Sequence, residues 1–265
     1  MSNAAVPNLL ATIVAAARTA VAERERRLPR ERLAARDTPG PRGAAFRSAL
    51  RDGAAPRIIA ECKRRSPSRG ILRQQYDPAA HARAYAEAGA AAISVLTEPT
   101  FFDGHLSHLE AVRAAVSTPV LRKDFLVTPY QVHEAAAAGA DAVLLIAAAL
   151  DGGELRALRE LAGSLGMAAL VEVHTREELD RALESGADVV GVNSRNLRTL
   201  SVDLDVTAGL AGAIPRNVIS VAESGITSGD DIRRLSALGF DAFLVGERLI
   251  TQPDPGAALE ALRTS

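Results

Sequence analysis

The stretch Ile58–Lys63 (IIAECK) is a short apolar run with charged residues near its end, and the chain repeats this pattern. Each run has five to seven residues, contains apolar and β-branched side chains, and ends near polar residues. Runs of this length and composition are typical of β-strands. The seven further runs are Ala92–Thr97, Val120–Asp124, Asp141–Ala147, Ala169–Val173, Asp188–Asn193, Val218–Glu223 and Asp241–Gly246.

Segments with helical spacing separate these runs, for example Glu154–Leu165 and Arg176–Glu184. Strands that alternate with helices predict βα units and a parallel sheet. Eight units between residues 58 and 246 predict an α/β fold, a single-domain (β/α)₈ TIM barrel. The alternative, a doubly wound sheet, needs a Gly-rich nucleotide turn after its first strand, which is absent here. Four connections end in a glycine suited to a left-handed helix cap: Gly89, Gly139, Gly186 and Gly239.

A different kind of segment precedes the first strand. Residues 8–27 have helical periodicity, residues 28–43 are rich in Arg, Pro and Gly, and residues 46–51 could form another short helix. We therefore divide the chain into an N-terminal helical extension, residues 1–50, and a barrel, residues 51–265. The extension is either a solvated, charged segment or a lid over one end of the barrel, and the sequence leaves both open.

Composition excludes several classes of protein. The 265 residues carry 31 Lys and Arg against 32 Asp and Glu, so there is no basic excess that predicts nucleic-acid binding. The longest apolar runs are too short to span a membrane. The single cysteine, Cys62, excludes an internal disulfide and a cysteine-based zinc site, and we expect it to pack in the core. These features predict a globular cytoplasmic protein.

The two lysines are conspicuous because the other 29 basic residues are all arginine. Arginine stays protonated at every physiological pH, so it cannot replace a lysine that must exchange a proton. Both lysines fall in or at the end of predicted strands, and active sites of such barrels lie at the carboxyl ends of the strands. Alternation along a strand then predicts one shared site for Glu61, Lys63, Lys123, Glu172, Asn193, Arg195 and Glu223.

Ammonium and carboxylate groups gathered at one end of a barrel adjust one another's pKa, which suits general acid and base catalysis. The alternative is a purely structural ion-pair cluster that closes the barrel. Two glycine-containing turns, Ser224-Gly225 and Gly246-Glu247, follow the last two strands, where barrels often bind phosphate. Plain turns are the alternative there. His105 and His108 lack a third ligand nearby, so the sequence predicts no metal site.

The stretch IIAECKRRSPSRGIL (58–72) resembles the signature I-A-E-x-K-x-x-S-P-S-x-G of the indole-3-glycerol phosphate synthase family. The resemblance continues in order through SVLTEPTFFDG (94–104), LRKDFLV (121–127), DAVLLIAAAL (141–150), LVEVH (170–174), GVNSRNLRTLSVDL (191–204), AESGI (222–226) and FLVGE (243–247). It implies a lyase of tryptophan biosynthesis without cofactor or metal. Its substrate would be 1-(2-carboxyphenylamino)-1-deoxyribulose 5-phosphate, and its products indole-3-glycerol phosphate, carbon dioxide and water.

The resemblance also implies roles for single residues. Lys123 would be the general acid that protonates the substrate carbonyl, with Glu61 as its partner. Lys63 and Glu172 would be the acid and base of the later dehydration, in an order that the sequence leaves open. Asn193 and Glu223 would orient hydroxyl and charged groups, Arg195 and Ser66 would bind anionic parts, and Ser224, Gly225, Gly246 and Glu247 would form the phosphate loops. The aromatic pocket would be lined by Phe102, Phe125, Leu144, Leu197 and Ile226.

Two other functions stay open. One is another phosphosugar enzyme, such as an isomerase or a Schiff-base aldolase that uses Lys63 or Lys123. The other is a non-catalytic barrel that binds a phosphorylated ligand, although it gives no reason to keep both lysines and their carboxylates. The expected partner is a small phosphorylated substrate, with no nucleic acid and no membrane. A monomer is expected, and weak association with other tryptophan-pathway enzymes is left open.

Overall fold

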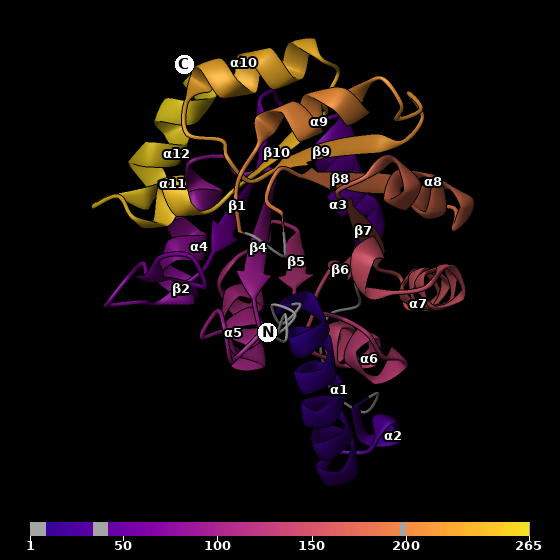
Figure 1. Ribbon diagram of the computed structural model, residues 1–265. Helices are drawn as coiled ribbons and strands as arrows, with labels where there is room; N and C mark the ends of the chain where they lie inside the picture. Colours follow the sequence, from indigo (N-terminus) through magenta and orange to yellow (C-terminus); the bar gives the residue numbers. More distant parts are fainter. Residues whose placement is uncertain (1–8, 34–41, 197–199, 265) are drawn as a thin grey trace, which may run out of the picture.

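Eight parallel strands form a closed barrel in the computed structural model, which describes residues 9–33, 42–196 and 200–264 (Figure 1). Neighbouring strands pair in the order β1-β10-β9-β8-β7-β6-β5-β4, and β4 closes the ring by pairing with β1. This confirms the predicted (β/α)₈ barrel. The strands are β1 (Arg57–Cys62), β4 (Ala92–Leu96), β5 (Val120–Lys123), β6 (Ala142–Ile146), β7 (Ala168–Val173), β8 (Val189–Asn193), β9 (Ile219–Glu223) and β10 (Ala242–Val245).

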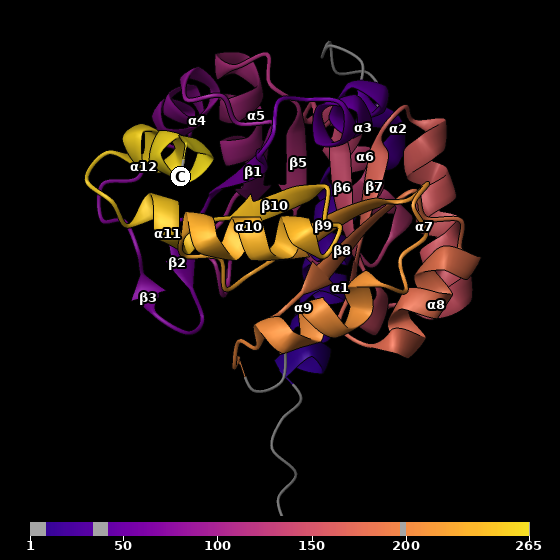
Figure 2. The ribbon, with the colours of Figure 1, turned by 90° about the horizontal axis from the view of Figure 1, so that it is seen from above.

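Helices surround the barrel on its outer side (Figure 2). The predicted glycine caps are confirmed, because Gly89, Gly139, Gly186 and Gly239 have φ of 81°, 85°, 85° and 100°. The helices after the strands are α4 (Pro78–Glu87), α5 (Leu106–Ala115), α6 (Pro129–Ala137), α7 (Gly152–Ser164), α8 (Arg176–Glu184), α9 (Leu204–Ala211), α10 (Gly229–Ala237), α11 (Glu247–Ile250) and α12 (Pro255–Thr264). Shorter elements are the hairpin β2 (Arg65–Ser66) and β3 (Gly70–Ile71) and the 3₁₀ turn η1 (Ala147–Ala149).

Alternation along the strands separates two apolar cores. One fills the space between the strands and the surrounding helices, and it contains Cys62 as expected. The other fills the barrel interior, where successive inward positions such as Ala168 and Leu170 belong to the same cluster. Because side chains alternate with a period of two, the next inward position of that strand is Glu172. The inward series thus changes from apolar to charged at the carboxyl ends of the strands.

The N-terminal segment covers both ends of the barrel. It consists of α1 (Leu9–Arg27), α2 (Arg30–Leu33) and α3 (Gly43–Arg51). Phe46 and Leu50 of α3 are fully buried and join the interior core, and α3 contacts β1, β4, β7 and β9. Leu10 and Ile13 of α1 join the same cluster at the opposite end, beside Phe125. Of the two alternatives for the extension, the structure therefore favours a lid and not a solvated, charged segment. The division of the chain at residue 50 stays a prediction.

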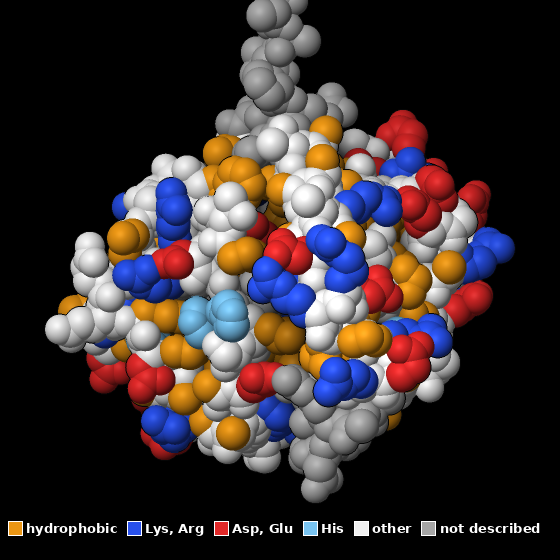
Figure 3. All heavy atoms as spheres, turned by 90° about the horizontal axis from the view of Figure 1, so that it is seen from below, with side chains coloured by type: hydrophobic (Ala, Val, Ile, Leu, Met, Phe, Trp, Pro, Cys, Tyr) orange, Lys and Arg blue, Asp and Glu red, His pale blue; other side chains and the backbone are white. Residues whose placement is uncertain are grey.

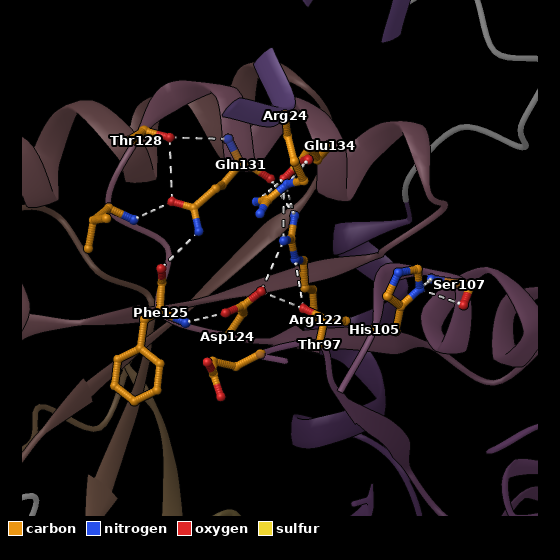
Figure 4. A network of polar contacts seen from close by, with 12 residues as sticks. Arg24, Thr97, His105, Ser107, Arg122, Asp124, Phe125, Thr128, Gln131 and Glu134 are labelled. Carbon is orange, nitrogen blue, oxygen red and sulfur yellow. Dashed lines mark hydrogen bonds and ion pairs between the residues drawn. The ribbon is translucent and has the colours of Figure 1, made fainter. Parts of the chain in front are cut away.

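A network of polar contacts, buried on the barrel side and partly exposed at Arg24, joins α1 to the barrel (Figure 4). Arg24 of α1 donates to both carboxylate oxygens of Glu134 on α6, at 2.7 and 3.0 Å. Glu134 also lies 3.5 Å from the guanidinium of Arg122 on β5, whose side chain is only 2% exposed. Arg122 in turn donates to Asp124 at 3.0 Å and to Thr97 at 3.1 Å. The lid helix is thus joined by ion pairs to the strand that carries Lys123.

No helix in the described part of the chain combines the length and the apolar character needed to cross a membrane. Figure 3 shows one face of the molecule, on which basic, acidic and apolar side chains are interspersed.

Replacement of Phe46 by alanine tests how α3 closes the barrel. Because the ring is completely buried in the interior core, Phe46→Ala should lower the free energy of unfolding by about 3–5 kcal/mol. Urea denaturation would measure this change. The neighbouring Arg47→Ala, which removes a partly exposed side chain, should change it by less than about 0.5 kcal/mol. Equal effects of the two substitutions would contradict the role of α3 as a plug.

Candidate active site

A cavity of about 520 Å³ opens at the carboxyl ends of the barrel strands. Its lining comes from several strands and the loops that follow them, as expected for the functional end of such a barrel. Most of the predicted site residues line it: Glu61, Lys63, Phe102, Lys123, Phe125, Leu144, Glu172, Asn193, Arg195, Ser224, Gly225, Ile226, Gly246 and Glu247.

Three predicted residues lie elsewhere. Glu223 is buried beside the cavity, and its carboxylate is in contact with Lys123. Ser66 borders a smaller adjoining cavity, together with Lys63, Phe102 and Arg195. Leu197 lies outside the described residues, so its predicted place in the aromatic pocket stays a prediction.

The charged groups form two adjacent clusters. Lys63 Nζ lies 2.6 Å from Glu61 Oε1. Lys123 Nζ lies 3.2 Å from Glu223 Oε2 and 3.4 Å from Glu172 Oε2. The family resemblance implies Glu61 as the partner of Lys123. Glu61 makes its ion pair with Lys63, but its charge also acts on Lys123, so the implied role stays a prediction. Glu61 and Lys63 extend from the same end of β1, which places them close together.

Two glycines make room for the buried carboxylates. A Cβ atom on Gly191 of β8 would lie 2.0 Å from Glu223 Oε1, and one on Gly246 would lie 2.2 Å from Glu61 Oε1. A side chain at either position would therefore force the neighbouring carboxylate to shift. Gly246 therefore has a steric role at the site, in addition to its predicted place in a phosphate loop.

Burial and charge set the pKa of each group. Burial disfavours the ammonium of Lys123, but the charges of Glu223, Glu172 and Glu61 outweigh it and raise its pKa far above the ordinary value. Burial also opposes ionisation of Glu61, yet Lys63 and Lys123 hold its pKa below the ordinary value. The pKa of Glu172 is lowered as well, since Lys123, His174 and Asn193 together outweigh burial. Lys123 is therefore protonated at neutral pH, and Glu61 and Glu172 are ionised.

Glu223 behaves differently from the other two carboxylates. Burial raises its pKa to about 7, and the charge of Glu172 adds to the rise, although Lys123 acts in the opposite direction. Three carboxylates surround two lysines, so full ionisation of all of them leaves an excess of negative charge. Glu223 is the group that absorbs this excess by holding a proton near neutral pH.

One side of the cavity is cationic and built from turns. Ser224 and Gly225 both have positive φ, 65° and 78°, which bends the chain sharply after β9. Arg69, in the turn between β2 and β3, forms an ion pair with Glu247. Arg248 donates from Nε to the carbonyl oxygen of Thr227 at 3.1 Å. The sequence analysis named neither Arg69 nor Arg248, although Arg69 lies within the motif of residues 58–72.

The opposite side of the cavity is apolar. The rings of Phe102 and Phe125 have centroids 6.4 Å apart, and Leu144 of the neighbouring strand β6 lines the same side. Ile226 also lines the cavity, but it follows the Ser224-Gly225 turn. Leu10 and Ile13 of α1 border the smaller adjoining cavity next to the two phenylalanines. The lid helix therefore completes the apolar wall, a contribution that periodicity within residues 8–27 could not reveal.

In the described parts of the chain, no three His, Cys, Asp or Glu side chains are grouped so that they could hold a metal ion. What the arrangement offers is a proton donor, Lys123, flanked by the ionised Glu172 and by Glu223, between an apolar wall and a cationic wall. This combination suits acid and base chemistry on a substrate that carries an aromatic ring at one end and an anion at the other.

Comparison of sequences identifies close relatives over nearly the whole chain. A family model described as indole-3-glycerol phosphate synthase matches residues 10–262. An indole-3-glycerol phosphate synthase from Mycolicibacterium smegmatis is 51% identical over 265 residues, covering 100% of this chain and 96% of the relative. One from Micrococcus luteus is 50% identical over 262 residues, covering 97% of this chain and 98% of the relative.

Comparison of structures supports the fold alone. A thiamine phosphate pyrophosphorylase from Pyrococcus furiosus superimposes with a TM-score of 0.63 at 20% identity, covering 83% of this chain and 96% of that one. A 3-hexulose-6-phosphate synthase gives 0.62 at 18% identity, covering 78% and 98%. Because the family model and both sequence relatives extend over the barrel and most of the N-terminal extension, the chain belongs to the indole-3-glycerol phosphate synthase family of carboxy-lyases.

Proposed function

We propose that this chain converts 1-(2-carboxyphenylamino)-1-deoxyribulose 5-phosphate into indole-3-glycerol phosphate, carbon dioxide and water, a step of tryptophan biosynthesis. The observation that carries the proposal is the position of Lys123. Its ammonium is buried between Glu172 and Glu223 and lines a cavity with one apolar and one cationic wall. Family membership supplies the reaction, and the geometry suggests which residues perform it.

Ring closure needs an acid at the substrate carbonyl. As the aromatic carbon that bears the carboxylate attacks the carbonyl carbon, the carbonyl oxygen gains an electron pair and takes a proton from Lys123 Nζ. Glu172 and Glu223 hold the ammonium in the cavity. The raised pKa of Lys123 supports this role over that of a Schiff-base nucleophile, which must be neutral to attack.

The later steps restore the aromatic ring and form the indole. The carboxylate leaves as carbon dioxide, and its bonding electrons return to the ring. The new hydroxyl then leaves as water, for which one group must donate a proton, while another removes a proton from the substrate. Lys63 and Glu172 are the proposed acid and base, since Lys63 is the second lysine lining the cavity and Glu172 is ionised. Glu61 keeps Lys63 in place through their 2.6 Å ion pair.

The two walls of the cavity suit the two ends of this substrate. We assign the phosphate to the turns of Ser224-Gly225 and Gly246-Glu247, where Arg69 and Arg248 add positive charge. The aromatic ring would lie against Phe102 and Phe125, where exclusion of water favours loss of carbon dioxide. Ser66 and Arg195, which border the adjoining cavity, would bind the carboxylate before it leaves. Asn193 would orient substrate hydroxyls.

The reaction contains no redox step, so the proposal includes no cofactor. We also propose a cytoplasmic location and a small phosphorylated substrate as the partner, in keeping with a biosynthetic carboxy-lyase. A monomer that associates weakly with other enzymes of the pathway remains the proposal for its assembly.

A fluorescence assay tests the proposed function directly. Purified protein incubated with the carboxyphenylamino-deoxyribulose phosphate and EDTA should produce indole fluorescence. A folded protein that produces none would contradict the proposal. Borohydride reduction in the presence of ketose and aldose phosphates would then examine the aldolase alternative, because a trapped lysine adduct identifies a Schiff base.

Replacement of Lys123 by arginine tests the general acid. Arginine preserves the positive charge between Glu172 and Glu223 but does not release a proton at neutral pH. We expect Lys123→Arg to fold normally and to lose at least about a hundredfold in kcat. Steady-state kinetics and circular dichroism measure the two effects. Arg234→Lys on the outer helix α10 is the matched control and should retain full activity. Near-normal turnover of Lys123→Arg would exclude the proposed role.

The raised pKa of Glu223 predicts a pH-dependent effect on stability. In the unfolded chain this carboxyl ionises near 4.5, whereas in the folded protein it holds its proton up to about pH 7. Between these values the folded state binds more protons, so the Glu223 contribution to stability falls as pH rises. Glu223→Gln should therefore raise the free energy of unfolding relative to wild type. This gain should be larger at pH 8 than at pH 5, by at least about 1 kcal/mol. Urea denaturation at both pH values measures this, and a difference independent of pH would contradict it.

A further inference from the structure

His174 lies directly after β7, two residues beyond Glu172, and no part of the proposed reaction uses it. Its side chain is only 13% exposed. The backbone N–H of His174 donates to Glu178 Oε2 on α8 at 2.6 Å, and its ring Nδ1 lies 3.2 Å from the same oxygen. Glu178 thereby fixes both the main chain and the ring of His174. The imidazole has little freedom to turn.

The other ring nitrogen of His174 faces the proposed base. Nε2 lies 3.6 Å from Glu172 Oε1. Both atoms are buried, and neither has a hydrogen-bond partner among the described residues. The second carboxylate oxygen of Glu172 is occupied by Lys123. A small rotation of either side chain would convert the contact between Nε2 and Oε1 into a hydrogen bond.

The charge state of the ring follows from the two carboxylates. A carboxylate only accepts hydrogen bonds, and a neutral imidazole has one N–H and one unshared electron pair. If Nδ1–H donates to Glu178, a neutral ring would direct its electron pair at the negative oxygen of Glu172. An imidazolium donates at both ends and removes this repulsion.

The surroundings of His174 are predominantly acidic. Glu172 faces it from β7, Glu178 from α8, and Glu223 acts on it from β9. Lys123 of β5 lies beyond Glu172, and Arg181 of α8 interacts with Glu178 and donates to the carbonyl oxygen of Ala147. Burial lowers the pKa of His174, but the hydrogen bond with Glu178 and the carboxylate charges outweigh it, so the pKa lies above the ordinary value.

We propose that His174 is a positioning residue for Glu172: clamped by Glu178, it orients the free carboxylate oxygen and balances its negative charge. The inference rests on the proposed role of Glu172 as a base. With Lys123 on one oxygen and His174 on the other, the carboxylate is fixed in one orientation toward the cavity. The positive ring also keeps Glu172 ionised, because His174 is one of the groups that lower its pKa.

The pH dependence of kcat tests this role. His174→Gln removes the positive charge but keeps a donor of similar reach. We expect the acid limb of the kcat profile to move up by about one pH unit, because Glu172 loses a neighbouring cation. At the pH where wild type retains half of its maximal kcat, the variant would retain about a tenth. KM for the substrate should change by less than about twofold, since His174 does not line the cavity.

Two further variants complete the kinetic experiment. Glu178→Gln releases the clamp and should move the acid limb in the same direction, by a smaller amount. His133→Gln replaces a histidine on α6, away from the cavity, and should leave the profile unchanged. Identical profiles of wild type and His174→Gln would overturn the proposal. So would a loss in His174→Gln that is the same at every pH, because this indicates a structural role only.

Titration of the imidazole by NMR gives a readout that does not depend on activity. The resonances of His174 should titrate above the ordinary histidine pKa of about 6.5 in wild type and closer to it in Glu178→Gln. An ordinary or lowered value in wild type would overturn the proposal. If wild type lacks synthase activity but His174 titrates as expected, the proposed function fails while the charged clamp stands. Failure of the two ideas can thus be distinguished.

Discussion

Two consecutive cations on β5 must both be neutralised inside the protein. Alternation along the strand directs Lys123 into the barrel and Arg122 toward the surrounding helices, and Arg122 is almost completely buried. A buried charge without a partner costs several kcal/mol, comparable with the stability of a domain. Lys123 is balanced by Glu172 and Glu223 within the barrel. Arg122 is balanced by Asp124 and Glu134 outside it (Figure 4). Much of the polar structure around β5 follows from this double requirement.

The outer half of this arrangement extends to the lid. Glu134 lies between Arg122 and Arg24, so the carboxylate that helps to neutralise β5 also holds α1. The same helix supplies Leu10 and Ile13 to the apolar wall next to Phe102. Placement of the lid and balance of the charge next to Lys123 are therefore linked through one side chain. The N-terminal extension is part of the architecture of the site.

Periodicity predicted the strands and their inward faces well, because it depends only on local geometry. Each end of a run lies within one residue of the strand end, as for Val120–Asp124 against Val120–Lys123. The scarcity of lysine also identified both ammonium groups of the site. Alternation placed Glu61, Glu172 and Glu223 on the inner face. The one assumption about tertiary structure behind these predictions was that the strands close into a barrel. The order of neighbouring strands was not needed.

Contacts between distant segments could not be predicted in this way. The ion-pair partner of Glu61 depends on the side-chain conformation of Lys63 just after β1. The spacing of residues along the sequence does not determine this conformation. The ion pair between Arg69 and Glu247 joins residues 178 positions apart. The places of α1 and α3 at opposite ends of the barrel depend on contacts with strands far away in the sequence. In each case the deciding quantity is a distance in the folded chain, and single-sequence patterns carry little information about it.

The excess of negative charge raises the free energy of burying the site, but it also provides groups that can exchange protons. Glu61, Glu172 and Glu223 exceed the two lysines by one charge, and the imidazolium proposed at position 174 would add a cation beside Glu172, although it is shared with Glu178. Below pH 7 the proton on Glu223 serves the same purpose. Two ionisable groups, His174 and Glu223, thus lie close to Glu172 and Lys123 and adjust the charge of the site. The proposed reaction donates one proton and accepts another within one turnover, and ionisable neighbours suit it in a way that an apolar barrel interior would not.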